Sequence, residues 1–79
     1  MATYRTVMVM GMNPLHPAVE EIMRYFEYDH LPDPLRAVSE RFHALAWVLV
    51  VELDGAELTV ALRKLLESKD AAVRAALPR

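Results

Sequence analysis

The stretch RYFEYDHLPDP, residues 24–34, holds the residues of this chain best suited to contact a ligand. Three of the six aromatic residues, Tyr25, Phe26 and Tyr28, lie within four positions of one another. Tyr28 falls two residues beyond the apolar repeat that ends at Phe26, and it stands close to His30. A phenol ring there can stack on a planar ligand, and stacking on a nucleobase contributes about 1–3 kcal/mol. The alternative is a structural corner, with Tyr25 and Phe26 in the core and Tyr28 packed where the chain turns.

Cations that could meet the phosphates of such a ligand occur in two later segments. Arg36 and Arg41 follow the proline-rich turn, and Arg63 and Lys64 lie further along the chain. Guanidinium and ammonium groups pair well with phosphate oxygens. These four cations join Tyr28 and His30 as the candidate ligand-binding residues.

Metal binding finds little support in the histidines. His16, His30 and His43 lie in different segments and form neither an H-x-x-H nor an H-E-x-x-H motif. They are expected to be surface or capping residues. The sequence therefore predicts no metal site and no cofactor.

Two kinds of catalytic site were compared with the sequence. Magnesium-dependent nucleotide hydrolases of the all-helical type need E-x-x-E and E-x-x-D pairs on facing helices. Glu67 and Asp70 supply one E-x-x-D, but no E-x-x-E accompanies it. Lys64 and Glu67 are better explained as an i, i+3 ion pair on a solvated helix face.

A nucleophilic site built from Ser39, His43 and Asp29 is equally incomplete. The chain has no nucleophile elbow and no glycine-rich turn that could stabilise a developing negative charge. Ser39 is instead expected on the exposed side of its helix. We do not expect the protein to be an enzyme.

Composition indicates self-association. The chain has 79 residues, of which 54% are hydrophobic, with two glycines and no cysteine. Without cysteine, no disulfide can stabilise this small domain. A chain with this apolar content would expose apolar surface as a monomer. Further copies of the same chain are the simplest partner, so we predict a homo-oligomer.

Charge and hydropathy limit the other partners. A net charge of −2 argues against binding to polymeric nucleic acid, which needs a basic surface. The longest apolar run, residues 44–51, is far shorter than the roughly 20 residues of a membrane span. The beginning of the chain lacks the features of a signal peptide. These patterns predict a soluble cytoplasmic protein with no membrane partner.

The chain divides into an N-terminal arm, residues 1–12, and a helical domain, residues 13–79. Residues 3–10 are rich in β-branched residues and methionine, which indicates a short strand or an extended arm. One strand finds no partner within this chain, so the arm either pairs with another copy or packs on helices.

Proline and acidic residues mark the starts of three helices. The first begins either at Asn13–Pro14, a helix-start or turn signal, or at Pro17, which suits the first helical position equally well, and it ends by about Leu31. The second begins at Asp33–Pro34, with Asp33 as N-cap, and runs to residue 52 or 53. The third follows a turn at residues 54–55, with Asp54 and Glu57 as a capping box.

Apolar residues repeat at helical spacing in the second and third helices. The second carries a stripe of Leu35, Val38, Phe42, Leu45 and Leu49, and the third carries Leu58, Leu62, Leu65, Ala72, Ala76 and Leu77. Residues 44–51 of the second helix are apolar on every side, which predicts burial on every side, partly by other subunits. The fold class that follows is all-α: an oligomeric antiparallel helical hairpin with a short leading helix and an extended N-terminal arm.

The motifs resemble those of a family of phage anti-defence proteins, small helical-hairpin sponges of the anti-CBASS and anti-Thoeris types. YFEY (25–28) resembles the F-x-Y of that family, followed by its proline-bearing loop. DPLRAVSERFHALA (33–46) resembles its first long helix. GAELTVALRKLLESKDAAVRAAL (55–77) resembles its E-x-[ST]-x-A-L-x-K-L-E-x-A helix. The similarity covers about two-thirds of the chain, and short actinobacteriophage members look closest.

This resemblance implies binding without turnover in the bacterial cytoplasm. Such proteins form oligomers, typically hexamers, and hold cyclic nucleotide immune signals between protomers. Position by position, Tyr28 corresponds to the tyrosine that stacks on a base, and Arg41 lies near a phosphate-binding cation. Thr59 and Lys64 match polar positions of the second hairpin helix, and Glu57 matches its capping acid.

The sequence departs from the family pattern at two positions. Asp29 stands where a histidine commonly follows the tyrosine, and its charge would repel a phosphate. Ala56 stands where an arginine is often found. The expected function is thus a sponge for cyclic nucleotides. The alternative is a structural helical oligomer that binds a host or phage protein.

Overall fold

Three α-helices make up most of the computed structural model, which describes residues 15–78. They are α2 (Pro17–Met23), α3 (Leu35–Glu52) and α4 (Ala56–Ala75), and a 3-10 turn, η1 (Arg24–Phe26), continues α2. No strand occurs within residues 15–78. The all-α prediction is confirmed for this part of the chain. The strand predicted at residues 3–10 and the boundary after residue 12 lie outside the described residues.

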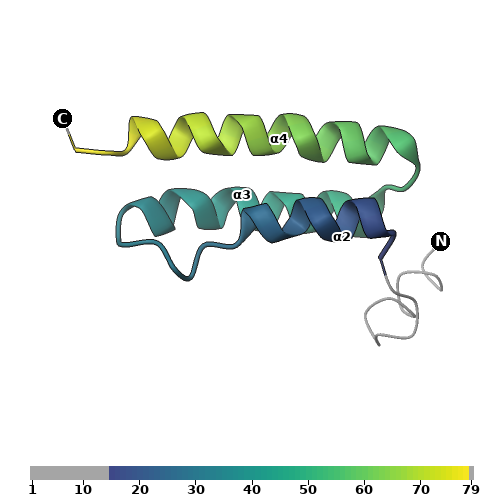
Figure 1. The fold of residues 1–79 in the computed structure, drawn as a ribbon, viewed down its shortest axis with the longest axis horizontal. Coiled ribbons are helices and arrows are strands. Elements are labelled where there is room, and N and C mark those ends of the chain that lie inside the picture. Colours follow the sequence, from purple (N-terminus) through teal and green to yellow (C-terminus); the bar gives the residue numbers. More distant parts are fainter. Residues whose placement is uncertain (1–14, 79) are drawn as a thin grey trace.

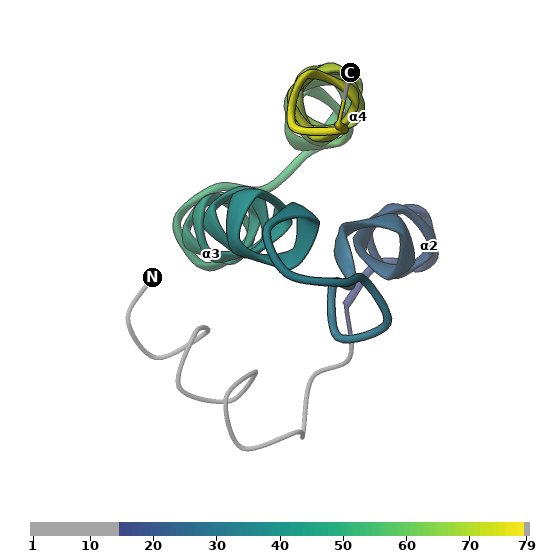
Figure 2. The ribbon, with the colours of Figure 1, turned by 90° about the vertical axis from the view of Figure 1, so that its left-hand side faces the viewer.

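The helices surround one core. α3 and α4 lie side by side and run in opposite directions, and α2 packs against α4 (Figure 1). Seen end-on, the three helices occupy the corners of a triangle (Figure 2). Apolar side chains from all of them fill the space between: Val19, Ile22, Met23, Phe26, Ala46, Val50, Leu58 and Leu62.

The first helix starts as predicted and ends early. Pro17 is its first residue, and Nδ1 of His16 accepts a hydrogen bond from the backbone N–H of Ala18 at 3.0 Å. This bond satisfies one of the free N–H groups of the first turn. After η1 the backbone becomes extended at Glu27, with ψ of 145°. The helical segment therefore ends at Phe26, five residues before Leu31, so Pro32 and Pro34 are not what ends it.

The second helix has the predicted extent but a different start. Pro34 occupies the N-cap position, and no side chain caps the helix. The prediction that Asp33 is the N-cap is wrong, because its carboxylate accepts a hydrogen bond from the Arg36 guanidinium instead. A charge-assisted bond to a guanidinium competes well with a bond to a backbone N–H.

The third helix is capped by a glycine rather than by a capping box. Gly55 is the N-cap residue, with φ of 89°, and no side chain bonds to the first turn. A positive φ of this size favours glycine, which has no Cβ to clash. The predicted capping box of Asp54 and Glu57 is therefore wrong. The helix ends at Ala75, and Leu77, predicted to continue its stripe, is 46% exposed.

The buried side of α3 matches the predicted stripe in part, since Phe42 and Leu49 pack half-buried against the core as expected. Its buried residues are Ser39, Ala46 and Val50, which share one face at helical spacing, whereas Leu45 is 46% exposed. Ser39, expected on the exposed side, is fully buried, and its hydroxyl oxygen has no hydrogen-bond partner among the described residues. Small side chains on this face leave room for the close approach of η1 and α4.

The opposite side of α3 is not covered by any of residues 15–78. We call Ala44, Leu45, Trp47, Val48 and Val51 the outer face of α3. Leu45 and Val48 are each 46% exposed and Trp47 is 38% exposed. Burial of residues 44–51 on every side stays a prediction, because the described residues of one chain bury only one of those sides.

We predict that Ser39→Ala raises the free energy of unfolding by about 1 kcal/mol, because an unpaired buried hydroxyl carries a desolvation cost. Urea denaturation measures this change. Ser68→Ala is the matched control, since Ser68 is an exposed helical serine and reports the gain in helix propensity alone. Equal gains for the two variants would contradict the prediction.

Candidate functional site

Three aromatic side chains gather on one side of α3, and we call them the aromatic cluster. The ring of Tyr28, from the loop after η1, lies 5.1 Å from that of His43 at an interplanar angle of 68°. The ring of His43 lies 6.4 Å from that of Trp47 at 73°. Both pairs have edge-to-face geometry, which is favoured between aromatic rings.

A hydrogen bond fixes the two members of the cluster that lie on α3. The indole Nε1 of Trp47 donates to Nε2 of His43 at 3.2 Å. His43 and Trp47 are four residues apart, hence one helical turn. Tyr28 packs on His43, and His43 in turn packs on Trp47.

The charges next to the aromatic cluster, from Arg36, Asp33 and Glu40, sum to −1. Arg36 lies on the same side of α3 as His43, but its guanidinium is paired with Asp33. Glu40 stands between the two at helical spacing and is exposed. The cluster can therefore stack on a planar group, but it offers little attraction to an anion.

A second surface beside the same loop is richer in cations. It is a hollow of about 410 Å³ lined by Arg24, Tyr25, Glu27, His30, Leu31, Lys69, Asp70, Val73 and Arg74. We call it the basic hollow. η1 and the loop after it form one wall, and the last turns of α4 form the other. Tyr25, expected in the core, is 57% exposed and lies here, whereas Phe26 is fully buried as expected.

Two cations of the basic hollow carry its free positive charge. Lys69 pairs with Asp70 at 3.2 Å. Arg24 and Arg74 form no ion pair with any of residues 15–78. The sequence analysis did not select Arg24, Lys69 or Arg74. Their positions in the sequence carry no signal, because only the packing of α4 against η1 brings them to one hollow.

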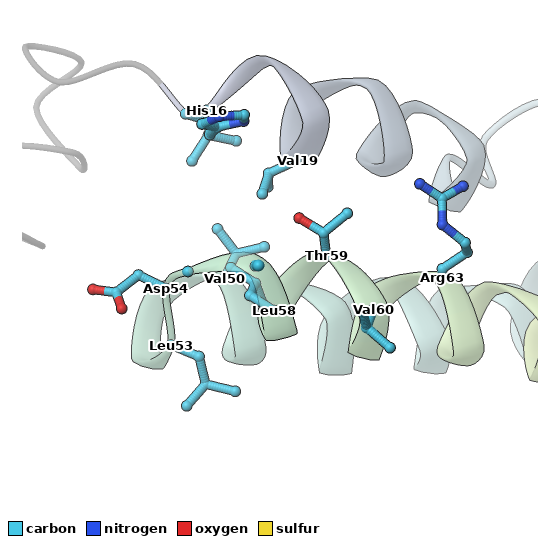
Figure 3. Close-up of a pocket in the computed structure, with 12 residues that line it drawn as sticks. His16, Val19, Val50, Leu53, Asp54, Leu58, Thr59, Val60 and Arg63 are labelled. Carbon is cyan, nitrogen blue, oxygen red and sulfur yellow. The ribbon is translucent and has the colours of Figure 1, made fainter.

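A third surface lies at the other end of the molecule. This terminal groove, of about 600 Å³, is formed by the start of α2, the end of α3 and the start of α4. Its lining is mostly apolar, with four polar residues: His16, Asp54, Thr59 and Arg63. Thr59 and Arg63 project from α4 toward the side of α2 (Figure 3).

The structure separates the seven residues predicted to bind a ligand. Tyr28 belongs to the aromatic cluster and His30 to the basic hollow, on either side of one loop. Thr59 and Arg63 line the terminal groove. The remaining three lie outside these surfaces: Arg36 pairs with Asp33, Lys64 pairs with Glu67 at 3.8 Å as expected, and Arg41 is exposed on α3.

Metal ligands and membrane-spanning helices were also expected to be absent. Within residues 15–78, no group of three or more histidine, cysteine or acidic side chains could hold a metal ion. None of the described helices combines the length and apolar character that crossing a membrane requires.

Comparison with known proteins gives no relative. The chain matches no family model, no curated protein and no solved structure. The resemblance to phage anti-defence hairpins thus rests on the motifs alone.

We predict that Tyr28 and His43 are energetically coupled by about 0.5–1.5 kcal/mol, the usual value for an edge-to-face aromatic pair. A double-mutant cycle of Tyr28→Ala and His43→Ala, measured by urea denaturation, gives this coupling. A cycle with the exposed Tyr25 in place of Tyr28 serves as the control. If both cycles were additive, Tyr28 would not pack on His43 in solution.

Proposed function

We propose that the protein binds a cyclic nucleotide or cyclic oligonucleotide signal and sequesters it without turnover, as a homo-oligomer. One observation carries the proposal: the loop from Tyr28 to His30 joins the aromatic cluster to the basic hollow. A nucleotide combines a planar base with an anionic phosphate. Adjacent aromatic and cationic surfaces suit both parts of such a ligand.

In this proposal Tyr28 and Trp47 contact the base, and Arg24 and Arg74 contact the phosphate. Trp47 is 38% exposed and can contribute part of its ring. The two arginines are unpaired among residues 15–78, so neither must give up a partner to meet an anion. Asp29, an exposed acid at the loop, limits how closely a phosphate can approach there.

An oligomer completes the site. Thr59 and Arg63 lie at the terminal groove, whereas Tyr28 packs on His43 near the middle of α3. The aromatic cluster, the basic hollow and the terminal groove have no lining residue in common, so each is a separate surface of the described chain. A neighbouring copy can bring its own terminal groove to the loop. The uncovered outer face of α3 supports such assembly, and the resemblance to the hairpin family favours a hexamer.

We predict that Tyr28→Ala abolishes ligand binding and that Tyr28→Phe retains it, because a phenyl ring stacks as well as a phenol. A thermal-shift screen with a panel of cyclic mono-, di- and trinucleotides measures binding. Ligand at 100 times its dissociation constant adds about 2.7 kcal/mol of stability. Trp47 is the single tryptophan, so quenching of its emission gives a second readout. Normal binding by the alanine variant would remove Tyr28 from the site.

We further predict that Arg24→Ala combined with Arg74→Ala weakens binding at least tenfold, the effect of losing charge-assisted bonds to phosphate. Titration of Trp47 fluorescence with the best ligand of the screen measures the dissociation constant. Arg63→Ala removes a positive charge from the terminal groove instead. A loss confined to Arg63→Ala would assign the phosphate to the terminal groove of another copy and not to the basic hollow.

A second candidate function is a helical oligomer that binds a host or phage protein. The terminal groove favours it, since an apolar hollow of about 600 Å³ suits an apolar segment of a protein partner. The same ligand screen distinguishes the two. Stabilisation by any cyclic nucleotide supports sequestration, whereas no shift across the panel by an intact oligomer favours the protein partner.

A further inference from the structure

Four residues of α3 form a self-complementary seam on the side facing away from the core. Arg41, Leu45, Val48 and Glu52 follow one another at steps of four, three and four, so they share one helix face. The core residues of α3 lie on the other side of the helix. The seam runs for about 16 Å along the axis.

The middle of the seam is apolar and its two ends carry opposite charges. Leu45 and Val48 are each 46% exposed, and Ala44 and Val51 flank them. Arg41 and Glu52 are exposed and form no ion pair with any of residues 15–78. The described part of the chain thus leaves the apolar pair uncovered and both charges unpaired.

We propose that this seam is the contact between two copies of the chain, with their α3 helices antiparallel about a two-fold axis. The axis passes midway between Leu45 and Val48. Each Leu45 then faces Val48 of the other copy, and each Arg41 faces Glu52 of the other copy. This inference rests on the oligomer in the proposed function and specifies one of its interfaces.

The charge pattern selects the direction of pairing. A parallel pair in register would place Arg41 against Arg41 and Glu52 against Glu52, which is repulsive. The antiparallel pair makes two attractive contacts instead. Because exposed ion pairs contribute little, the apolar pair supplies the affinity, and the charges fix the orientation.

Charge exchange tests the direction directly. Arg41→Glu and Glu52→Arg each place like charges at both ends of the seam, so each variant alone should associate about tenfold more weakly than the unaltered chain. An equimolar mixture of the two variants should recover association, because one carries only acids and the other only arginines at these positions. Light scattering and sedimentation equilibrium of the full chain give the masses.

The apolar centre is tested by Val48→Asp, which should weaken association about a hundredfold, since both copies bury a charge there. Leu77→Asp is the matched control: Leu77 has the same 46% exposure but follows α4 and lines neither the terminal groove nor the basic hollow, so the mass of this variant should equal that of the unaltered chain. Circular dichroism checks that every variant keeps its helices.

Three results would overturn the seam. The first is an oligomer whose mass is unchanged by Val48→Asp, and the second is weaker association of Arg41→Glu that mixing with Glu52→Arg does not restore. The third is a monomer at every concentration. The first two leave an oligomer built on another face. The third removes the oligomer itself. Ligand binding at Tyr28 is decided separately by the thermal-shift screen, so failure of the seam and failure of the proposed function give different results.

Discussion

The structure depends on how much of α3 the rest of the chain can cover. α3 is apolar around its whole circumference through residues 44–51, and among the described helical elements it packs mainly against α4 and η1. Those neighbours bury Ala46 and Val50 and leave Leu45, Trp47 and Val48 facing solvent. The neighbours of α3 cover its inner side and leave its outer face exposed. Burial of apolar area is the main force in folding and association, so the uncovered side of α3 favours contact with a second copy.

The same packing creates the surfaces that could bind a ligand. η1 ends with Phe26 in the core, which fixes the start of the loop that follows. Two residues further on, Tyr28 packs on His43, and the chain then reaches His30 in the basic hollow. One anchored side chain thus places a ring on one side of the loop and a cation-lined hollow on the other. Function at this loop would follow from the close packing of η1 against α3 and α4.

Much of the helical architecture could be predicted from the sequence, because it follows from local patterns. The extent of α3 came from apolar spacing between a proline turn and the Asp54–Gly55 turn, and Pro17 marked the start of α2. Capping was predicted less well. Asp33 and Asp54 are good N-cap residues by type. The Asp33 carboxylate instead accepts a hydrogen bond from Arg36, and Gly55 rather than Asp54 is the N-cap residue of α4. Caps depend on side-chain competition that residue type alone does not decide.

The sequence by itself determined the helices and the fully buried position of Phe26, because helical periodicity and turn residues act over a few neighbouring positions. Only the tertiary structure decided which side of α3 is covered, and it buried Ser39 where an exposed serine was expected. Only tertiary packing joined Arg24 to Arg74, fifty residues apart, in one hollow, and it separated Tyr28 from Arg63. Contacts between distant segments depend on which helix faces pack together. The face of a helix that becomes buried depends on all of the helices around it.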